Sequence, residues 1–537
     1  MLSYRKLAMR VLGRPLHTEG IDSPRPASQR AAAFILTAAM LTTLAAPAFA
    51  DIWHIENGDI TISAGESGNN VTQNNNTTYG DTNTIITNQN KDTASSHTVT
   101  IEAKDKDDKV EVTLKDVNID TSSRNKAAVS VTGEGDTNIK LDGDNALKSD
   151  IYRSGIYGSG SGSLTISGGE NDSLTAQGGS GANGISSSGS LTISGGTVTA
   201  NGDDGGRGIS SNGGVTISGG STVTANGGSG TISGGDGIWS GGGVTISGGS
   251  TVTANGGNGG SLVGGDGIRS GGGLTVSDGT VTAKGGNGDS KDGYGGDGIR
   301  SGGVVTISGN TVNAAGGYGG KVGGYGICSF DRVAISGGTV EAAGGNGSTG
   351  GGSGIYSSVI DLSGSLELTA KAGSPNGKAL SQKGSELVLD TIKDKLGPGA
   401  KVTATDADGK VIDQVSTPRP VEPEESSSSS DSGSATPSAP ASPLPGLTVT
   451  DKDGQRISYT STQSGNTLTV CVGRLTASFR ISLAALRQLR AEGIETIAFQ
   501  TVLCSTTLSV DELLAMGGEN AEAVLTHRFT DSSLTVG

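Results

Sequence analysis

One short pattern recurs along the middle of this chain, and its spacing limits what the chain can fold into. A Gly-Ile pair occurs at eight positions, from Ile156 to Ile355, at intervals of 24 to 31 residues. From Ile185 to Ile327, the centre of an L/V-T-I-S segment always follows eight residues later, and a T-V-T-A segment is centred five or six residues after that. All the variation in length therefore falls in the stretch that leads to the next Gly-Ile pair.

Each repeat holds three short segments in which apolar and polar residues alternate, for example 208–211, 215–218 and 222–225. Alternation with a period of two is typical of strands with one buried face. A unit this small cannot bury its own apolar side, but stacking each strand on its equivalent in the next repeat forms one continuous core. The pattern predicts an all-β, three-sided parallel β-helix, right-handed because parallel β crossovers almost always are.

The constant intervals also predict the corners. Two corners of each coil have fixed lengths, so we expect them to be tight, with glycine supplying positive φ angles. The third corner varies in length and is expected to project outward as a loop. Glycine is the commonest residue of the chain, 94 of 537, which agrees with so many corners.

The pattern weakens towards both ends and sets the expected domain boundaries. We assign the β-helix to residues 98–415, with its least regular coils acting as caps. Residues 51–97 are rich in Asn and Thr and are expected to form a partly ordered polar lead-in. Residues 416–446 are rich in Pro, Ser and acids, which predicts a solvated linker. Residues 447–537 return to a globular composition and predict a small α+β domain with a helix beginning at Ser482.

The N-terminus predicts export. Residues 1–50 contain six basic residues, then an apolar run, then Ala48-Phe49-Ala50, which together are typical of a secretory signal peptide cleaved before Asp51. The alternative is an uncleaved N-terminal anchor; no other stretch of the chain is apolar and long enough to span a bilayer. The formal net charge is −15, which argues against nucleic acid as a partner. We therefore expect a secreted protein, whether free or associated with the cell surface.

A resemblance to a known family appears at the start of the β-helix. It is carried by the segments V-T-L-K-D-V-N-I-D, A-A-V-S-V, N-I-K-L-D-G-D-N-A-L, G-S-L-T-I-S-G-G and G-G-T-V-T-A-N-G. These resemble secreted carbohydrate-binding β-helix proteins of Gram-positive bacteria, over roughly residues 98–390. The resemblance implies a fold similar to pectate-lyase-type helices and binding of polysaccharides, in some members with calcium. It supplies no binding residues, because the matching positions are mostly core and corner residues.

The outward side chain that follows each Gly-Ile pair forms one column along the predicted rod. Three neighbouring members of this column, Trp239, Arg269 and Arg300, are our candidate ligand-binding residues. An aromatic ring suits the face of a sugar, and guanidinium groups suit its hydroxyls and carboxylates. The alternative is that these are ordinary exposed strand residues. The column contains, in order, Tyr157, Ser186, Ser210, Trp239, Arg269, Arg300, Cys328 and Tyr356.

An acidic column accompanies it. Asp236, Asp266 and Asp297 each occur two residues before the isoleucine, in G-G-D-G-I. Carboxylates repeated on adjacent coils are candidate calcium ligands. The alternative is a structural role, because Asp in a glycine-rich corner often caps its own turn.

Three classes of function remain open. We expect a non-catalytic, adhesin-like protein that binds a polysaccharide or surface glycan, with calcium as a candidate cofactor. An enzyme would need clustered carboxylates beside a base, and the segment G-D-G-I-R-S-G-G supplies such a pairing on two coils. Because that segment is identical on both coils, it favours a binding array over a unique catalytic centre. The third class is a structural surface rod without a small ligand.

Overall fold

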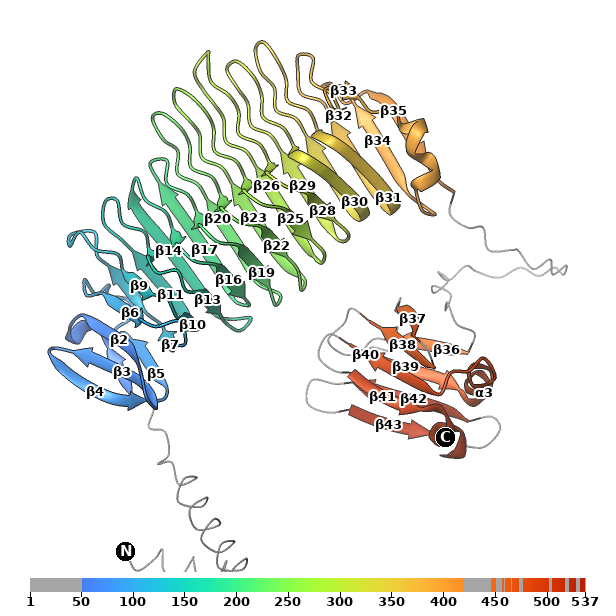
Figure 1. Ribbon diagram of the computed structural model, residues 1–537, viewed down its shortest axis with the longest axis horizontal. Helices are drawn as coiled ribbons and strands as arrows, with labels where there is room; N and C mark the ends of the chain where they lie inside the picture. Colours follow the sequence, from blue (N-terminus) through green and yellow to red (C-terminus); the bar gives the residue numbers. More distant parts are fainter. Residues whose placement is uncertain are drawn as a thin grey trace, which may run out of the picture. The chain divides into compact units, whose positions relative to one another are not determined.

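The computed structural model describes residues 51–418 and, in the C-terminal part, 446–450, 456–457, 459–464, 466–472, 477–501, 505–516, 521–527 and 532–536. These residues fall into two compact units, one on each side of the Pro/Ser-rich segment (Figure 1). The predicted signal peptide and most of the predicted linker lie outside the described residues. Each unit is described by itself.

The first unit confirms the predicted fold. It is a parallel β-solenoid of about 13 turns, consistent with a right-handed β-helix, and its 35 strands form one continuous hydrogen-bonded sheet. The strands that begin with the Gly-Ile pairs stack in one column, which we call face A. In chain order, face A contains β2 (Ile60–Gly65), β6 (Val99–Ala103), β9 (Val129–Gly133), β12 (Ile156–Gly158), β15 (Ile185–Ser187), β18 (Ile209–Ser211), β21 (Ile238–Ser240), β24 (Ile268–Ser270), β27 (Ile299–Ser301), the starts of β30 (Ile327–Ala343) and β31 (Ile355–Lys371), and β32 (Leu380–Gln382).

Two further columns complete the triangle. Face B contains β1 (Ile52–His54), β5 (Thr84–Thr87), β7 (Lys109–Lys115), β10 (Asp136–Asp142), β13 (Leu164–Ser167), β16 (Leu191–Ser194), β19 (Val215–Ser218), β22 (Val244–Ile246), β25 (Leu274–Val276), β28 (Val305–Ile307) and the middle of β30 and β31. Face C contains β8 (Asn118–Asp120), β11 (Asp144–Lys148), β14 (Ser173–Ser180), β17 (Thr197–Asp203), β20 (Thr222–Asn226), β23 (Ser250–Asn255), β26 (Gly279–Lys284), β29 (Thr311–Ala315), the ends of β30 and β31, and β34 (Lys401–Thr405).

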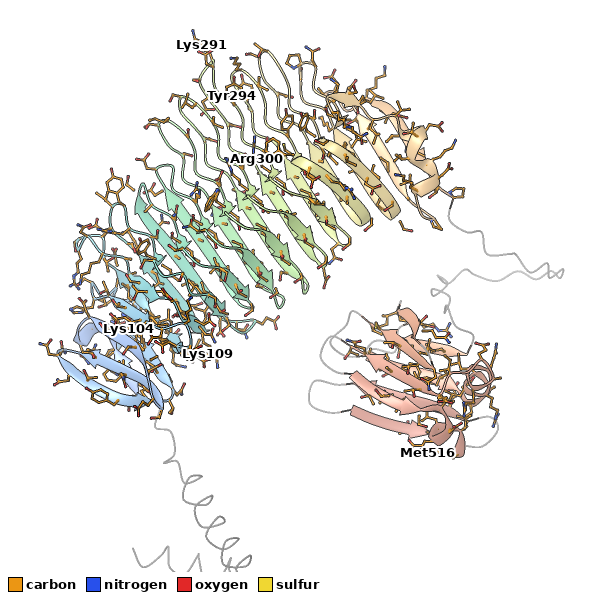
Figure 2. The ribbon with its side chains drawn as sticks, viewed as in Figure 1. Lys104, Lys109, Lys291, Tyr294, Arg300 and Met516 are labelled. Carbon is orange, nitrogen blue, oxygen red and sulfur yellow. The ribbon has the colours of Figure 1, made fainter. Side chains whose placement is uncertain are left out.

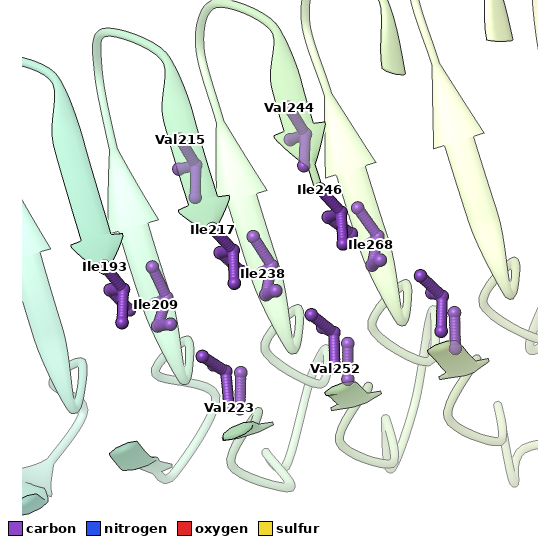
Figure 3. Packing of buried hydrophobic residues seen from close by; sticks show 14 of the residues in the cluster. Ile193, Ile209, Val215, Ile217, Val223, Ile238, Val244, Ile246, Val252 and Ile268 are labelled. Carbon is purple, nitrogen blue, oxygen red and sulfur yellow. The ribbon is translucent and has the colours of Figure 1, made fainter. Parts of the chain in front are cut away.

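The interior is filled by apolar side chains at equivalent positions of the coils, and Figure 3 shows part of this core, from Ile193 to Ile268. In the coil that begins at β21, Ile238 on face A, Ile246 on face B and Val252 on face C have no exposed surface. Each pairs with the matching residue of the next coil, for example Ile238 with Ile268. Fully burying one such side chain stabilises the fold by about 1.5–3 kcal/mol, so the core is a sum of equal, repeated contributions.

A buried serine column satisfies the backbone at the corner between faces A and B. The residue two positions after each Gly-Ile isoleucine is Ser211, Ser240 and Ser270 in three successive coils, each almost fully buried. The Ser240 hydroxyl donates to the carbonyl of Gly213 at 2.9 Å, in the preceding coil. A buried hydroxyl without such a partner would cost free energy, so the repeated serine is explained by this bond.

Only one of the two tight corners uses glycine in the way we expected. Between faces B and C, Gly248 and Gly249 have φ angles of 63° and 71°. Between faces A and B, Gly241 and Gly271 do not adopt positive φ in that range. A Cβ on Gly271 would instead lie 2.3 Å from the carbonyl oxygen of Gly241. At this corner glycine is required by the close approach of successive coils.

The variable loops project from the corner between faces C and A, as predicted, but they are packed and not loose (Figure 1). Their two limbs meet at glycines: the N–H of Gly257 donates to Gly235 O, and the N–H of Gly265 donates to Gly257 O, both at 2.8 Å. A Cβ on Gly265 would lie 1.9 Å from Gly235 O. We call this chain of bonds the glycine seam; it joins, in order, Gly228, Gly235, Gly257, Gly265, Gly286, Gly296, Gly317, Gly324, Gly345 and Gly352.

The N-terminal segment is more ordered than the sequence suggested. The predicted polar lead-in forms β1, β2 and β5, which join the solenoid, together with η1 (Ile55–Asn57). Strands β3 (Gly68–Gln73) and β4 (Asn76–Asp81) add an antiparallel hairpin to β2. Ile60, Ile62 and Val71 are fully buried there. This order was not predicted, because Asn and Thr dominate the composition of the segment and its few apolar residues lie at alternate positions. The hairpin covers this end of the core as a cap.

The opposite end closes differently. After β32, the chain forms β33 (Ser385–Glu386), η2 (Leu389–Lys395), β34 and an antiparallel strand β35 (Val411–Ser416). Leu389 of η2 is fully buried against the last coil. The antiparallel partner ends the parallel stack, which otherwise would present a free strand edge.

Within its described residues, the second unit contains two four-stranded sheets and two helices. One sheet has β36 (Leu447–Thr450), β39 (Ala477–Ser482), β42 (Glu522–His527) and β43 (Ser532–Val536); the other has β37 (Thr460–Ser464), β38 (Thr467–Cys471), β40 (Thr496–Gln500) and β41 (Ser505–Ser509). Helix α3 (Leu483–Ala491) begins after Ser482, whose hydroxyl accepts from the N–H of Ala485 at 3.2 Å. The other helix is α4 (Val510–Met516).

Candidate functional site

The acidic residues singled out from the sequence belong to a column at the foot of the loops. The column holds the residue two positions before each Gly-Ile isoleucine, and in successive coils it contains Asn183, Arg207, Asp236, Asp266, Asp297 and Tyr325. Within it, a side-chain oxygen accepts the N–H of the equivalent residue in the next coil. Asp236 Oδ1 accepts from Asp266 N at 2.9 Å, and Asp266 Oδ1 accepts from Asp297 N at 2.7 Å. We call this column the Asx ladder.

This arrangement corrects the structural alternative considered from the sequence. An Asp in this corner was expected to cap its own turn, but Asp297 Oδ1 accepts from the N–H of Tyr325, 28 residues later, at 2.7 Å. The reason is parallel stacking, which brings the N–H of the next coil within hydrogen-bond distance of the carboxylate. The acids therefore hold neighbouring coils together.

The second carboxylate oxygen of each acid faces an arginine. Asp266 Oδ2 lies 3.7 Å from Arg269 Nη1 and 3.2 Å from Arg300 Nε. Asp297 Oδ2 lies 2.9 Å from Arg300 Nη2. Asp236 Oδ2 is 3.3 Å from Arg207 Nε. Asp266, Asp297, Arg269 and Arg300 thus form one charge network across adjacent coils, and Asp236 and Arg207 form a separate ion pair beside it.

The network is buried on its acidic side and open on its basic side. Asp266 and Asp297 are 4% and 1% exposed, whereas the side chains of Arg269 and Arg300 are 51% and 32% exposed. Burial, together with repulsion from Asp297, raises the pKa of Asp266 to about 7. Burial also raises the pKa of Asp297 to about 6, against the opposing attraction of Arg300. Both carboxyls therefore titrate near neutral pH.

The predicted ligand-binding residues do lie side by side. Trp239, Arg269 and Arg300 are Cα partners in register on β21, β24 and β27. We call these three residues the face A strip. Cys328 continues the column but is 1% exposed, and burial raises the pKa of its thiol to about 12, so it stays protonated at neutral pH.

Three neighbours of the strip were not singled out from the sequence. The Arg207 guanidinium lies 4.4 Å from the centre of the Trp239 ring, and that of Arg300 lies 5.9 Å from the Phe330 ring. Tyr325 stacks on Tyr356 with ring centres 4.9 Å apart. Arg207 and Tyr325 occupy the same repeat position as the acids, so aligning that position across coils would have found them. No repeat signal points to Phe330.

A hollow of about 570 Å³ lies between the loop limbs and the face A strip. Its lining includes both candidate arginines, Arg269 and Arg300, the acids Asp236 and Asp266, and Val263 from a loop. Arg207 also lines it. Figure 2 shows Arg300 at the foot of the loops and Tyr294 farther out on its loop. Trp239 and Asp297 border this region without lining the hollow.

The acidic column does not fit calcium as arranged here. Across the described residues, no group of three or more His, Cys, Asp or Glu side chains is placed to hold a metal ion. Each acid of the Asx ladder gives one oxygen to a backbone N–H and turns the other towards a guanidinium, with 3.7 Å as the longest of these ion-pair distances. A cation placed there would be repelled by the arginines. We therefore derive no step through calcium.

A scan against protein-family models and searches of curated proteins and of solved structures found no match to this chain. Among the residues that the structure describes, no helix has the length and apolar character needed to cross a bilayer.

Proposed function

We propose that this chain is a secreted or cell-surface, non-catalytic protein that binds a polysaccharide. The observation that carries the proposal is the face A strip: an indole ring and two guanidinium groups on three adjacent strands, beside a hollow. The ring offers an apolar surface for a sugar face, and the guanidinium groups offer several N–H donors for sugar hydroxyls or acidic groups. The Gram-positive resemblance in the sequence points the same way.

The direction of the strip suits a polymer. Successive side chains are one strand spacing apart, about 4.8 Å, and they follow the axis of the rod. An extended chain lying along the rod would meet Trp239, then Arg269, then Arg300. These residues stand on strands that are paired on both sides, so little conformational freedom would be lost on binding.

The alternative of an enzyme has one observation in its favour. Asp266 and Asp297 carry raised pKa values, as a general acid needs. However, a general acid must approach the glycosidic oxygen within hydrogen-bond distance, and these carboxyls are almost fully buried under the arginines. Binding is therefore favoured over catalysis.

A glycan array with and without calcium tests the proposal. For a polysaccharide that binds, we expect Trp239→Ala and Arg269→Ala each to weaken binding by roughly tenfold, the effect of about 1.4 kcal/mol at a central contact. Thr245→Ala is the matched control, because the Thr245 side chain is exposed on face B, away from the strip; this variant should bind as the parent does. Analysis of the bound sugar for cleavage products would reveal an enzyme.

Two outcomes would redirect the proposal. Failure to bind any glycan would favour the structural rod. Unchanged binding by both strip variants would move the site to the loops, where Tyr294 and Tyr318 are 41% and 47% exposed. Export is tested separately, because the N-terminus of the secreted protein should be at or near Asp51.

A further inference from the structure

Among the Asn and Asp residues of the Asx ladder, Asn183 carries no charge, and it separates two roles of the acids. Asn183 Oδ1 accepts from the N–H of Arg207 at 2.8 Å, the same bond that Asp236 makes to Asp266 at 2.9 Å. An amide oxygen therefore suffices to join the coils. The negative charge at Asp266 and Asp297 must serve the other oxygen, which faces the arginines.

Those outer oxygens are held by ion pairs and not by well-aligned hydrogen bonds. Within the described residues, Asp266 Oδ2, Asp297 Oδ2 and Arg300 Nε are buried and lack a well-aligned hydrogen bond. They are nevertheless only 2.9–3.2 Å from opposite charges. Arg300 is thus held mainly by charge, and its guanidinium also lines the hollow. A competing anion in the hollow could attract it without breaking a directional bond.

The groups that face the two acids determine the charge of the site. Those that act on the acids are Asp236, Arg269, Arg300, Tyr325 and Cys328. Tyr325 and Cys328 are neutral at pH 7, since burial raises the pKa of both. With every acid ionised, the charges of the three acids cancel those of the three arginines, counting Arg207. With one acid protonated, the site becomes cationic.

We propose that the hollow binds an anionic group of a glycan, a carboxylate or a sulfate ester, through Arg269 and Arg300, and that Asp266 takes up a proton from solvent as the anion binds. The one bond that forms is the O–H bond of Asp266, whose proton comes from solvent; the incoming anion replaces the internal carboxylate as the partner of the guanidinium groups. This inference rests on the proposed polysaccharide-binding function and specifies the ligand and its regulation. It needs no metal ion.

The direction of the pH effect follows from the charges. The pKa of Asp266 is already near neutral in the free protein, and a second anion beside it disfavours ionisation further. Binding is then linked to proton uptake, so affinity rises as pH falls. Uptake of one proton allows at most a tenfold change per pH unit, and we expect about tenfold tighter binding at pH 6 than at pH 8.

The test uses the full secreted chain and three probes: a galacturonate hexamer, its carboxyl-reduced neutral form and a sulfated form of the neutral hexamer. Titration calorimetry in two buffers of different ionisation enthalpy should show proton uptake with the two anionic probes and none with the neutral one. Below about pH 4 the carboxylate probe becomes protonated and should lose affinity. The sulfated probe should keep its affinity, which distinguishes the two anion sources.

Asp266→Asn removes the charge and retains the inter-coil bond, as Asn183 does. At pH 8 it should bind the anionic probes about tenfold more tightly than the parent, with little pH dependence between pH 6 and pH 8. Asp278→Asn, an exposed corner acid between β25 and β26, is the matched control and should behave as the parent. Unchanged pH dependence in Asp266→Asn, or binding without proton uptake in the parent, would overturn the inference.

The proposed function can fail separately. If the neutral probe binds at the strip while the anionic probes show no linkage, only this inference is lost. If none of the probes binds, and no sugar of the glycan array binds, the polysaccharide-binding function itself is lost. Proton uptake in the parent remains a valid test even if Asp266→Asn fails to fold.

Discussion

Two parts of each coil stack along the same axis by different means. In the triangular core, side chains such as Ile246 fill the space between strands and leave no exposed surface. In the loops, the two limbs meet through the glycine seam, where Gly265 lies too close to Gly235 for even a methyl group. The core is held by the burial of side chains, and the seam by backbone contacts alone. The core should therefore tolerate substitution of one apolar side chain by another of different shape. The glycine seam should tolerate no added side chain.

The largest expected effect is a charge in the core. Ile246→Asp buries a carboxylate without a partner and should reduce the free energy of unfolding by about 4 kcal/mol or more. Chemical denaturation of the full chain, followed by circular dichroism, measures the loss. Thr245→Asp is the matched control, because Thr245 lies on the same strand but is exposed. A similar loss in both variants would contradict the inward orientation of Ile246.

The second prediction addresses the seam. Gly265→Ala places a methyl group 1.9 Å from Gly235 O. It should reduce the free energy of unfolding by about 3 kcal/mol, because the atoms it meets belong to the backbone and cannot rotate away. Gly249→Ala provides the comparison: its φ is +71° and no atom lies within 4 Å of the added Cβ, so only the backbone conformation is strained, by about 1 kcal/mol. Equal losses in the same denaturation assay would mean that close approach does not explain the loop glycines.

The charge network lies at the junction of the two regions and should respond by an intermediate amount. Arg300→Ala leaves Asp266 and Asp297 without their main cation and should reduce the free energy of unfolding by about 2 kcal/mol at pH 8. The loss is smaller than for a fully buried pair, because the Arg300 side chain is 32% exposed and solvent screens its charge. The cost should shrink at pH 5, where the acids are protonated. Arg269→Ala, with a more exposed side chain at 3.7 Å from its partner, should cost much less.

The last prediction concerns the pH dependence of the stability of the parent. Asp266 and Asp297 have pKa values of about 7 and 6, raised from 3.8 by burial. A raised folded-state pKa gives stability that is fully present below the unfolded pKa and is lost as pH rises through the folded value. The free energy of unfolding should therefore fall between about pH 4 and pH 7. In Asp266→Asn this slope should be smaller; a slope equal to that of the parent would exclude Asp266 as its source.

The repeat made the core predictable, because interval and alternation are properties of the sequence alone. The invariant eight residues from Ile238 to Ile246 gave the strand register, which the structure confirms. The reason for the glycines was harder to predict. Positive φ was expected at both tight corners, yet the corner at Gly271 needs glycine for contact with another coil, a distance that no local pattern reports.

The sequence predicted which residues of the site line up along the rod, but not the partners of their side chains. Stacking placed Trp239, Arg269 and Arg300 in one row, as expected. The pairing of each acid with both a backbone N–H of the next coil and an arginine depends on side-chain directions at the foot of the loops. Residue type alone therefore suggested calcium, whereas the arginines beside Asp266 oppose a cation.

The Asx ladder has a consequence for how such a chain can lengthen. Each coil that carries Asn or Asp in the ladder presents the next coil with the same acceptor, so duplication of such a repeat in the gene would insert a coil that already matches both neighbours. The segment G-D-G-I-R-S-G-G, present unchanged on two adjacent coils, is what such an event leaves behind. Every added copy would bring one more arginine to the face A strip and one more buried acid to the Asx ladder. The number of repeats would then set how many sugar units of one polymer the protein contacts at once. Each added repeat would raise the avidity for the polymer while the fold stays the same.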